Sequence, residues 1–287
     1  MFDSYDRKIE ANGTFLAGYR QQNVCRSMMP SFLFTTLRVI RVLSGDAEWR
    51  IGATCRHIRR GDLVAVNNVE LRQFVSASPD FVYDTYAFTP AVFSSHRLCL
   101  CFFYNRPDRF SPVFCPEDAC HAKATLLLDM LTDLFLSDAR TPETAILAAS
   151  LITSVISLMM ADRRECLEVQ NVRRLSTAAV ADTILYIHQH LTEDLSVKRL
   201  AERAAMSRGY FSAVFRRCTG IGLPGFVNGA RAAHVVELLQ SGAKRNVLDA
   251  ALASGFDSSS GFYKSFKAVF GVPPLKYIGS FGEAGTT

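Results

Sequence analysis

The side chains with the clearest chemical potential are cations at helical spacing in the C-terminal part of the chain. Arg208, Arg216 and Arg217 fall on the polar side of a helix predicted to begin after Ser207, and aromatic and aliphatic residues take its other side. A solvated row of guanidinium groups binds anions such as phosphate. This helix therefore offers cations to an anionic partner.

A shorter helix is predicted just before this one. Ser196 is its cap, and Val197, Leu200 and Ala204 have the spacing of a buried helix face. Only three or four residues around Met206 separate the two helices. The pattern predicts a helix-turn-helix whose second helix carries the cations.

A second copy of the pattern follows between Asn246 and Gly271. It has a short apolar helix, a glycine turn, and a capping serine, Ser258, in the place that corresponds to Ser207. A helix predicted over residues 225–240 lies between the copies and spans roughly 24 Å at 1.5 Å per residue. With the widths of the flanking units, it can hold the two second helices about 34 Å apart, which is one turn of DNA.

These stretches carry a specific family resemblance. From about Thr177 to Ser280 the chain resembles the DNA-binding domain of the AraC/XylS family, in which one helix joins two helix-turn-helix units. The matching segments are LAERAAMSRGYFSAVFRRCTG, RAAHVVELL and ASGFDSSSGFYKSFKAVFGVPPLKY. A helical bundle with a basic solvated face is the alternative, but it does not account for the repeat.

The resemblance implies which residues contact DNA, because exposed positions in the first turns of the second helix face the base edges. In the first unit these positions are Arg208, Gly209, Tyr210, Ser212, Ala213, Arg216 and Arg217. In the second unit they are Ser258, Ser259, Ser260, Gly261, Tyr263, Lys264 and Lys267. Relatives commonly have longer side chains where this chain has Gly209 and Ala213, so we expect limited direct base readout by the first unit. Tyr263 is a contact residue or a packing residue.

The distribution of charge agrees with a nucleic-acid partner in the C-terminal half. Residues 171–287 contain 14 Lys and Arg against 8 Asp and Glu, a net charge of +6. Residues 1–170 contain 18 against 19, a net charge of −1. The positive charge therefore belongs to the half with the repeated motif, as phosphate binding requires.

The N-terminal part alternates apolar and polar residues in short runs that glycine turns interrupt, which predicts strands. The segments RVLSGDAEWRI and IRRGDLVAV resemble the cupin-type sensor barrel that many AraC-family proteins carry. Strands at this spacing indicate a small antiparallel barrel or sandwich, and the resemblance favours the β-barrel. Its predicted apolar interior would hold Phe32, Phe34, Val39, Trp49, Phe74, Phe81, Tyr83 and Tyr86, which either surround a ligand or form plain core.

Candidate metal ligands and catalytic groups are sparse. His57 and His96 are isolated, and the group of Cys115, Cys120 and His121 has no fourth ligand. The sequence contains no constellation of acid, base and nucleophile. We expect neither a metal, nor another cofactor, nor an enzymatic activity.

Two helices are predicted after the barrel. The second contains an uncharged run from Thr144 to Ala161, but Ser150, Thr153, Ser154 and Ser157 form a polar stripe along it, so we expect a packed helix rather than a membrane span. The apolar surface of the pair either packs entirely on the barrel or forms a homodimer contact.

The predicted fold class is therefore α+β: a small antiparallel, cupin-like β-barrel, a helix pair, and an all-α double helix-turn-helix domain. We expect a sensor and dimerisation domain over residues 1–165, with the barrel at about 10–110 and the helix pair at about 118–161. The linker is predicted at 166–176 and the DNA-binding domain at 177–287.

The expected function is that of a sequence-specific transcription regulator. It is expected to be cytoplasmic, since residues 1–12 do not look like a signal peptide and the eight cysteines lack disulfide spacing. Expected partners are promoter DNA, RNA polymerase, a second copy of the chain, and a small hydrophobic effector or a regulatory protein. An activator is favoured, and a repressor or an effector-independent architectural DNA-binding protein remains the alternative.

Overall fold

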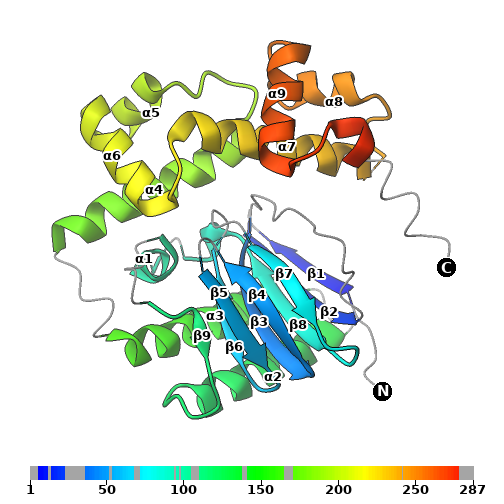
Figure 1. Cartoon of the computed structure of the whole chain (residues 1–287). Helices are drawn as coiled ribbons and strands as arrows, with labels where there is room; N and C mark the ends of the chain where they lie inside the picture. The colour runs from blue at the N-terminus through cyan, green and yellow to red at the C-terminus, as the bar shows by residue number, and fades with distance from the viewer. Residues whose placement is uncertain are drawn as a thin grey trace. The chain divides into compact units, whose positions relative to one another are not determined.

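The computed structural model describes residues 6–11, 14–22, 36–51, 54–67, 72–93, 95–96, 98–104, 110–137, 141–164, 171–240 and 242–277 (Figure 1). The chain divides into two compact units, and the main change between them falls between Ala181 and Asp182. We call them the N-terminal unit and the C-terminal unit and describe each by itself.

The N-terminal unit contains two sheets. Its strands are β1 (Asp6–Ala11), β2 (Thr14–Gln22), β3 (Leu37–Ser44), β4 (Asp46–Ile51), β5 (Thr54–Arg59), β6 (Leu63–Val66), β7 (Arg72–Ala77), β8 (Val82–Phe88) and β9 (Val113–Phe114). Six strands form one sheet in the order β1-β2-β8-β3-β6-β9, and three form the other in the order β5-β4-β7.

The predicted α+β class is confirmed, but the prediction of a closed barrel is wrong for the described strands. They form two open sheets, and the chain passes from one to the other at the glycine turns Gly45 and Gly61, which have φ angles of 68° and 95°. The edge strand β9 has only two residues, too few to continue hydrogen bonding into the second sheet. Closure needs a matched strand number and stagger, which an alternating sequence pattern does not specify.

The two faces of the larger sheet have different coverings. Ile40 and Val42 of β3 belong to a core cluster with Trp49 of β4, so their face lies between the sheets. There Trp49 stacks on Phe74, with ring centroids 4.9 Å apart, and Phe81 and Tyr83 complete the packing.

The opposite face of this sheet is covered by helices. Tyr86 lies on it and its hydroxyl is 2.7 Å from that of Thr132, so Tyr86 and its cross-strand neighbour Val39 are not in the inter-sheet interior, contrary to expectation. Strand alternation gives Val39 this position, since Ile40 next to it points between the sheets. Phe32 and Phe34 lie outside the described residues.

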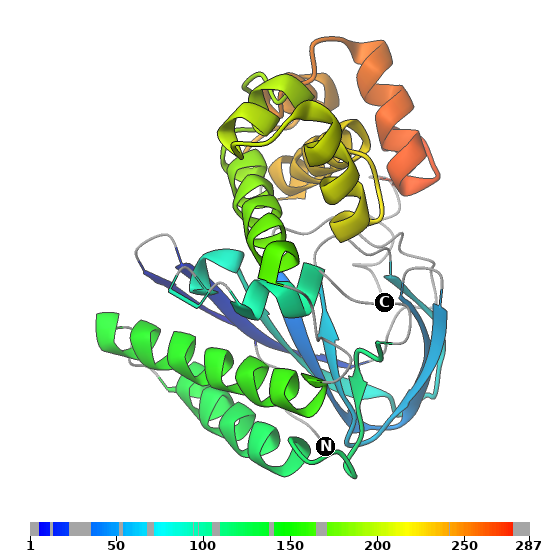
Figure 2. The same cartoon turned by 90° about the vertical axis from the view of Figure 1, so that its left-hand side faces the viewer.

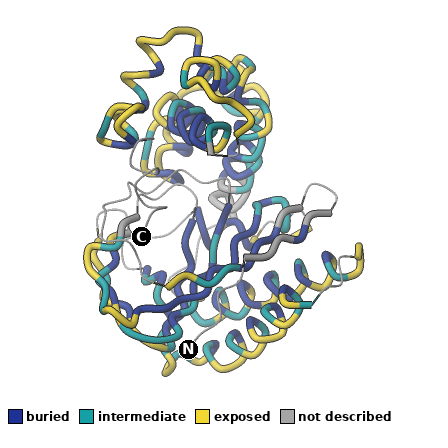
Figure 3. The backbone as a smooth tube through the Cα atoms, turned by 90° about the vertical axis from the view of Figure 1, so that its right-hand side faces the viewer, coloured by how far each residue is buried: buried dark blue, intermediate teal, exposed yellow. Residues whose placement is uncertain are grey.

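The helices of this unit are η1 (Pro90–Phe93), α1 (Leu98–Tyr104), α2 (His121–Leu136) and α3 (Pro142–Asp162), and Figure 2 shows α2 and α3 side by side along the larger sheet. Gly18 of β2 permits the close approach of α2 to the sheet, because a Cβ at this position would lie 2.5 Å from the ring of Phe135 on α2. Figure 3 shows exposed residues on the sides of the pair turned away from the sheet.

Among the described helices, α3 alone is long and apolar enough to cross a membrane. Length and composition are weak evidence, because core helices of folded domains share them. Ile152, Val155 and Met159 are completely buried in the unit. The stripe of hydroxyls bonds along the helix, and Ser154, for example, donates to the Ser150 carbonyl at 2.9 Å. The packed helix pair is therefore confirmed.

The C-terminal part is helical. It contains α4 (Asn171–Gln189), α5 (Val197–Arg203), α6 (Arg208–Thr219), α7 (Leu223–Gln240), α8 (Val247–Ala253) and α9 (Ser259–Phe270). Of the predicted linker, residues 166–170 lie outside the described residues and 171–176 belong to α4. The domain boundaries 1–165 and 177–287 stay a prediction.

The pairs α5/α6 and α8/α9 repeat one another in detail. The first helices have 7 residues each and the second helices 12 each. Ser207 and Ser258 cap the second helices by accepting the backbone N–H three residues on, and Gly220 and Gly271 end them in the left-handed conformation. The predicted double helix-turn-helix is therefore confirmed, together with its capping residues.

The second turn is one residue longer than the first, and the residue with a positive φ angle differs between them. Ala205 has a φ of 52° in the first turn and is exposed, whereas Gly255 has a φ of 89° in the second. A Cβ on Gly255 would lie 2.1 Å from the carbonyl oxygen of Leu191. The first turn therefore tolerates a side chain that the second cannot accept.

These two positions give opposite expectations for the same chemical exchange. Gly255→Ala should destabilise the C-terminal unit by at least about 2 kcal/mol, because it adds a backbone clash to an unfavourable φ. Ala205→Gly should change stability by no more than about 0.5 kcal/mol, because relief of φ strain and added chain entropy nearly cancel. Urea unfolding of the full chain, followed by circular dichroism, measures both. Equal effects of the two substitutions would contradict the described turn geometry.

Candidate nucleic-acid interface

Helix α6 presents its polar residues to solvent. Phe211, Val214 and Phe215 are buried, with at most 1% of their surface exposed, and they anchor the helix to its own unit. The residues of the first unit that are predicted to contact DNA are all exposed on this helix: Arg208, Gly209, Tyr210, Ser212, Ala213, Arg216 and Arg217. The aromatic side therefore fixes the helix and leaves a cationic side accessible.

Helix α9 is built in the same way. Phe262, Phe266 and Phe270 are buried in a cluster with Phe256 and Tyr277. The predicted contact residues on the other side are all exposed: Ser258, Ser259, Ser260, Gly261, Tyr263, Lys264 and Lys267. The structure thus groups each set on one helix, and these groupings are what a DNA interface needs.

The two helices offer different side chains to a groove. A Cβ at Gly209 would have no heavy atom within 4 Å, so position 209 in the first turn of α6 is open to solvent and has no side chain. Tyr263 of α9 packs edge-on against Phe262 at 5.2 Å and is 38% exposed, so it is a packing residue that is also accessible to a partner. Side chains long enough for bidentate base contacts are scarce at the start of α6.

Further cations flank the two helices and were not among the predicted contacts. Lys198 on α5, and Lys244 and Arg245 just before α8, are exposed. Their signal in the sequence is their place in or before the first helix of each repeat, which crosses the DNA backbone in helix-turn-helix complexes. Arg203 is exposed as well, but its guanidinium lies over the Tyr186 ring, 4.0 Å from the ring centroid.

The side chains considered as metal ligands have other neighbours. His57 Nδ1 is 3.0 Å from Glu48 Oε1, and His121 Nε2 is 2.6 Å from the carbonyl oxygen of Gly61. The Cys115 thiol lies 3.4 Å from a carboxylate oxygen of Asp118. In the part of the chain that the structure describes, no three His, Cys, Asp or Glu side chains are grouped so that they could hold a metal ion.

Comparisons of sequence agree with this interface. A family model described as a helix-turn-helix domain matches residues 200–280. The Transposon Tn10 TetD protein of Escherichia coli is 31% identical over 106 residues, which are 37% of this chain and 75% of TetD. The transcriptional activator AarP of Providencia stuartii is 28% identical over 104 residues, 36% of this chain and 76% of AarP. The melibiose operon regulatory protein of Escherichia coli is 29% identical over 107 residues, but these are 37% of this chain and 35% of that protein.

The fold of the whole chain also has a solved counterpart. A crystal structure of ToxT from Vibrio cholerae has a TM-score of 0.59 at 13% identity, covering 92% of this chain and 97% of ToxT. At this identity the likeness concerns the fold, in which antiparallel sheets precede a helical DNA-binding part. The similarity to TetD and the match to the helix-turn-helix model, over the tandem capped helices, show that this chain belongs to the AraC family of helix-turn-helix transcription regulators.

Proposed function

We propose that this regulator activates transcription by placing α6 and α9 in successive major grooves of promoter DNA. The observation that carries the proposal is the pair of equally capped helices, each with a buried aromatic side and an exposed cationic side. AarP, a relative over this region, is named as an activator, which supports the same sign of regulation here. The corresponding partners are RNA polymerase and promoter DNA, and the corresponding location is the cytoplasm.

The exposed residues of α6 and α9 divide into two roles under this proposal. Arg208, Ser212, Ser260 and Lys264 lie in the early turns and face the bases, whereas Arg216, Arg217 and Lys267 lie in the last turns and contact phosphates. Because Gly209 and Ala213 present no long side chain, α6 contributes more through phosphate contacts and DNA shape than through base readout.

Replacing one late cation on each helix tests the phosphate contacts. The double variant Arg216→Ala, Lys267→Ala should bind DNA more weakly, and the slope of log K against log salt should become shallower by roughly 2, since each phosphate contact contributes about 0.9. Fluorescence anisotropy across a salt series measures the slope. Arg59→Ala, Arg60→Ala removes the same charge from the N-terminal unit and is the matched control. An unchanged slope in the first variant would remove both residues from the contact list.

The N-terminal unit has a buried polar site that suits an effector. Arg38 lies on the inter-sheet face, as do Thr85 of β8 and Tyr19 of β2 by cross-strand register. Burial lowers the pKa of the Arg38 guanidinium, which the phenols of Tyr19 and Tyr83 partly oppose. Thr85 is 1% exposed, and among the described residues its hydroxyl has no hydrogen-bond partner.

These groups favour an amphipathic carboxylate as the effector. A guanidinium and a hydroxyl donate hydrogen bonds to a carboxylate, and the aliphatic and aromatic inter-sheet residues suit its hydrocarbon part. A structure of ToxT is described as bound to an unsaturated fatty acid. We therefore propose effector control by a ligand of this class, which falls within the small hydrophobic or amphipathic ligands expected from the sequence.

Run-off transcription by purified bacterial RNA polymerase tests activation and effector control together. The promoter carries a site selected by the protein, and oleate is the probe. The wild-type chain should stimulate transcription and oleate should change that stimulation. Arg38→Met should weaken oleate binding by at least about tenfold, because it removes a charge-assisted hydrogen bond worth about 1.5–3 kcal/mol. The single tryptophan, Trp49, lies in the inter-sheet core, so its fluorescence reports binding.

Methyl oleate, which lacks the carboxylate charge, is the matched ligand control and should bind the wild-type and Arg38→Met chains equally weakly. Equal oleate binding by the two chains would disprove the role of Arg38. Transcription that falls when the protein is added would favour a repressor, and transcription that does not change would favour an architectural DNA-binding protein.

The exposed side of α2 and α3 supports a homodimer. Leu126, Met130, Ile146 and Leu147 are between 46% and 67% exposed on this side. A groove of about 690 Å³ runs between the two helices there, with Leu126 and Ser154 among its lining residues. Exposed apolar side chains grouped in this way mark an interaction surface, and a second copy of the chain is the occupant we propose.

One charge on this surface should dissociate the homodimer. Leu126→Asp should shift the chain toward monomer by at least about tenfold in Kd, because the carboxylate loses hydration in an apolar contact. Sedimentation equilibrium of the full chain gives the distribution. Leu275→Asp changes an equally exposed leucine, 66% exposed, in the C-terminal part and is the control. Dimerisation that is equally strong in both variants would place the contact elsewhere.

A further inference from the structure

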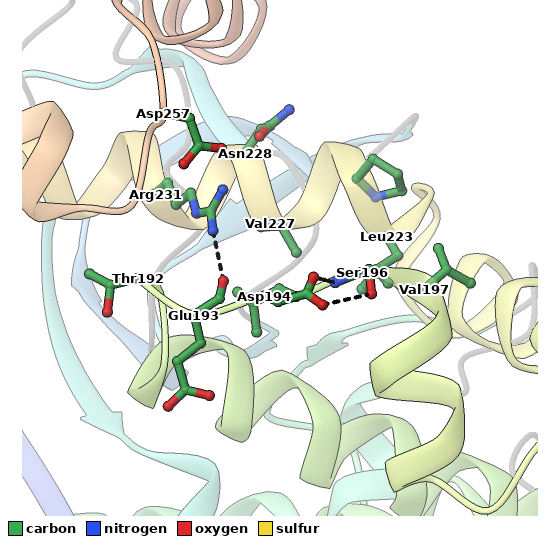
Figure 4. Close-up of a pocket in the computed structure, with 12 residues that line it drawn as sticks. Thr192, Glu193, Asp194, Ser196, Val197, Leu223, Val227, Asn228, Arg231 and Asp257 are labelled. Carbon is green, nitrogen blue, oxygen red and sulfur yellow. Dashed lines mark hydrogen bonds between the residues drawn. The ribbon is translucent and has the colours of Figure 1, made fainter.

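The junction between the two helix-turn-helix repeats is hollow. A cavity of about 490 Å³ lies between the loop after α4, the start of α5, the first half of α7 and the second turn (Figure 4). Its lining includes Asn228 and Arg231 of α7 and Asp257 of the second turn. Apolar packing joins α7 to both repeats elsewhere, as at Phe215 and Phe226, but it does not fill this point of the junction, where polar contacts cross beside the cavity.

The strongest of these contacts come from Arg231, which projects from the connecting helix. Its Nε donates to the carbonyl oxygen of Leu191 at 2.8 Å, and its Nη2 donates to the carbonyl oxygen of Glu193 at 3.2 Å. Figure 4 shows the guanidinium reaching the backbone at Glu193. Two hydrogen bonds from one planar group fix both the position and the tilt of α7 against the segment that precedes the first repeat.

The second repeat rests on the same carbonyl group. Gly255 packs so closely that a Cβ on it would lie 2.1 Å from the Leu191 oxygen and 3.0 Å from Arg231 Nε. Asp257 stands two residues further along, and its carboxylate partly offsets the effect of burial, which lowers the pKa of Arg231. Three segments, namely the loop after α4, the connecting helix α7 and the second turn, therefore meet at the carbonyl oxygen of Leu191.

We propose that Arg231 is a positioning residue that sets the separation and orientation of α6 and α9, and with them the spacing of the two DNA segments that the protein reads. This inference rests on the proposed binding of both helices to one duplex. Arg231 itself contacts no DNA, since it points into the junction. If its two hydrogen bonds are lost, α7 and the contact of Gly255 with Leu191 still join the repeats, but the guanidinium no longer fixes the tilt of α7. The repeats should then accept several spacings.

The test uses full-length protein and DNA selected by the wild-type chain from a random duplex library. The two half-sites of the selected sequence are then moved apart or together in steps of one base pair, and affinities are measured by anisotropy. The wild-type chain should prefer the selected spacing by at least about tenfold, because only that spacing allows both helices to bind at once. Arg231→Ala should reduce this preference to less than about threefold while affinity for a single half-site changes little.

Two variants make the result decisive. Asn228→Ala changes another residue that lines the cavity from the same helix and should keep the wild-type preference for spacing. Arg231→Lys keeps the charge but offers one point donor in place of the fork, so its preference should be intermediate. If Arg231→Ala does not fold, the spacing preference of Arg231→Lys alone tests the inference. A wild-type chain that selects no two-part site would overturn the proposed function and this inference with it. A two-part site with an unchanged spacing profile in the Arg231 variants would overturn this inference alone.

Discussion

The carbonyl oxygen of Leu191 is the point on which the architecture of the DNA-binding part depends. Leu191 is 8% exposed and follows the end of α4, where helical carbonyls lack a partner within the helix. Arg231 provides that partner, and Gly255 leaves the space for it. An unpaired buried carbonyl costs roughly 1–3 kcal/mol. The hydrogen bond that avoids this cost also holds the connecting helix α7 against the segment before the first repeat.

Each repeat separates its structural residues from its binding residues. The serine cap, the buried aromatic side and the final glycine fix α6 and α9 in the same way, and of these only the cap Ser258 also belongs to the predicted contact residues. The exposed side does differ: α6 has Arg208 at its start and Arg216 and Arg217 in its last turn, whereas α9 has Tyr263 and Lys264 in its middle and Lys267 in its last turn. Two equal scaffolds can in this way read two unequal DNA segments.

The features that the sequence predicted correctly are those whose signals are local. Caps, helical periodicity and turn glycines act within a few residues, so the repeat, its boundaries and the exposure of its polar residues followed from the chain alone. The contact between Arg231 and Leu191 joins residues 40 apart, and no local pattern marks it. Alternation in β3 likewise predicted a strand, but neither the open sheets nor the face occupied by Val39 could be decided without the pairing of strands.

Three arginines of the larger sheet show why the inter-sheet position is unusual. Arg20 forms a two-point ion pair with Asp84, and Arg41 pairs with Asp129 of α2, both on the face that the helices cover. Arg38 lies on the other face, where apolar residues dominate and burial lowers its pKa. In the proposed effector control, this cation would bind the carboxylate of an amphipathic ligand, and the apolar residues between the sheets would contact the hydrocarbon part.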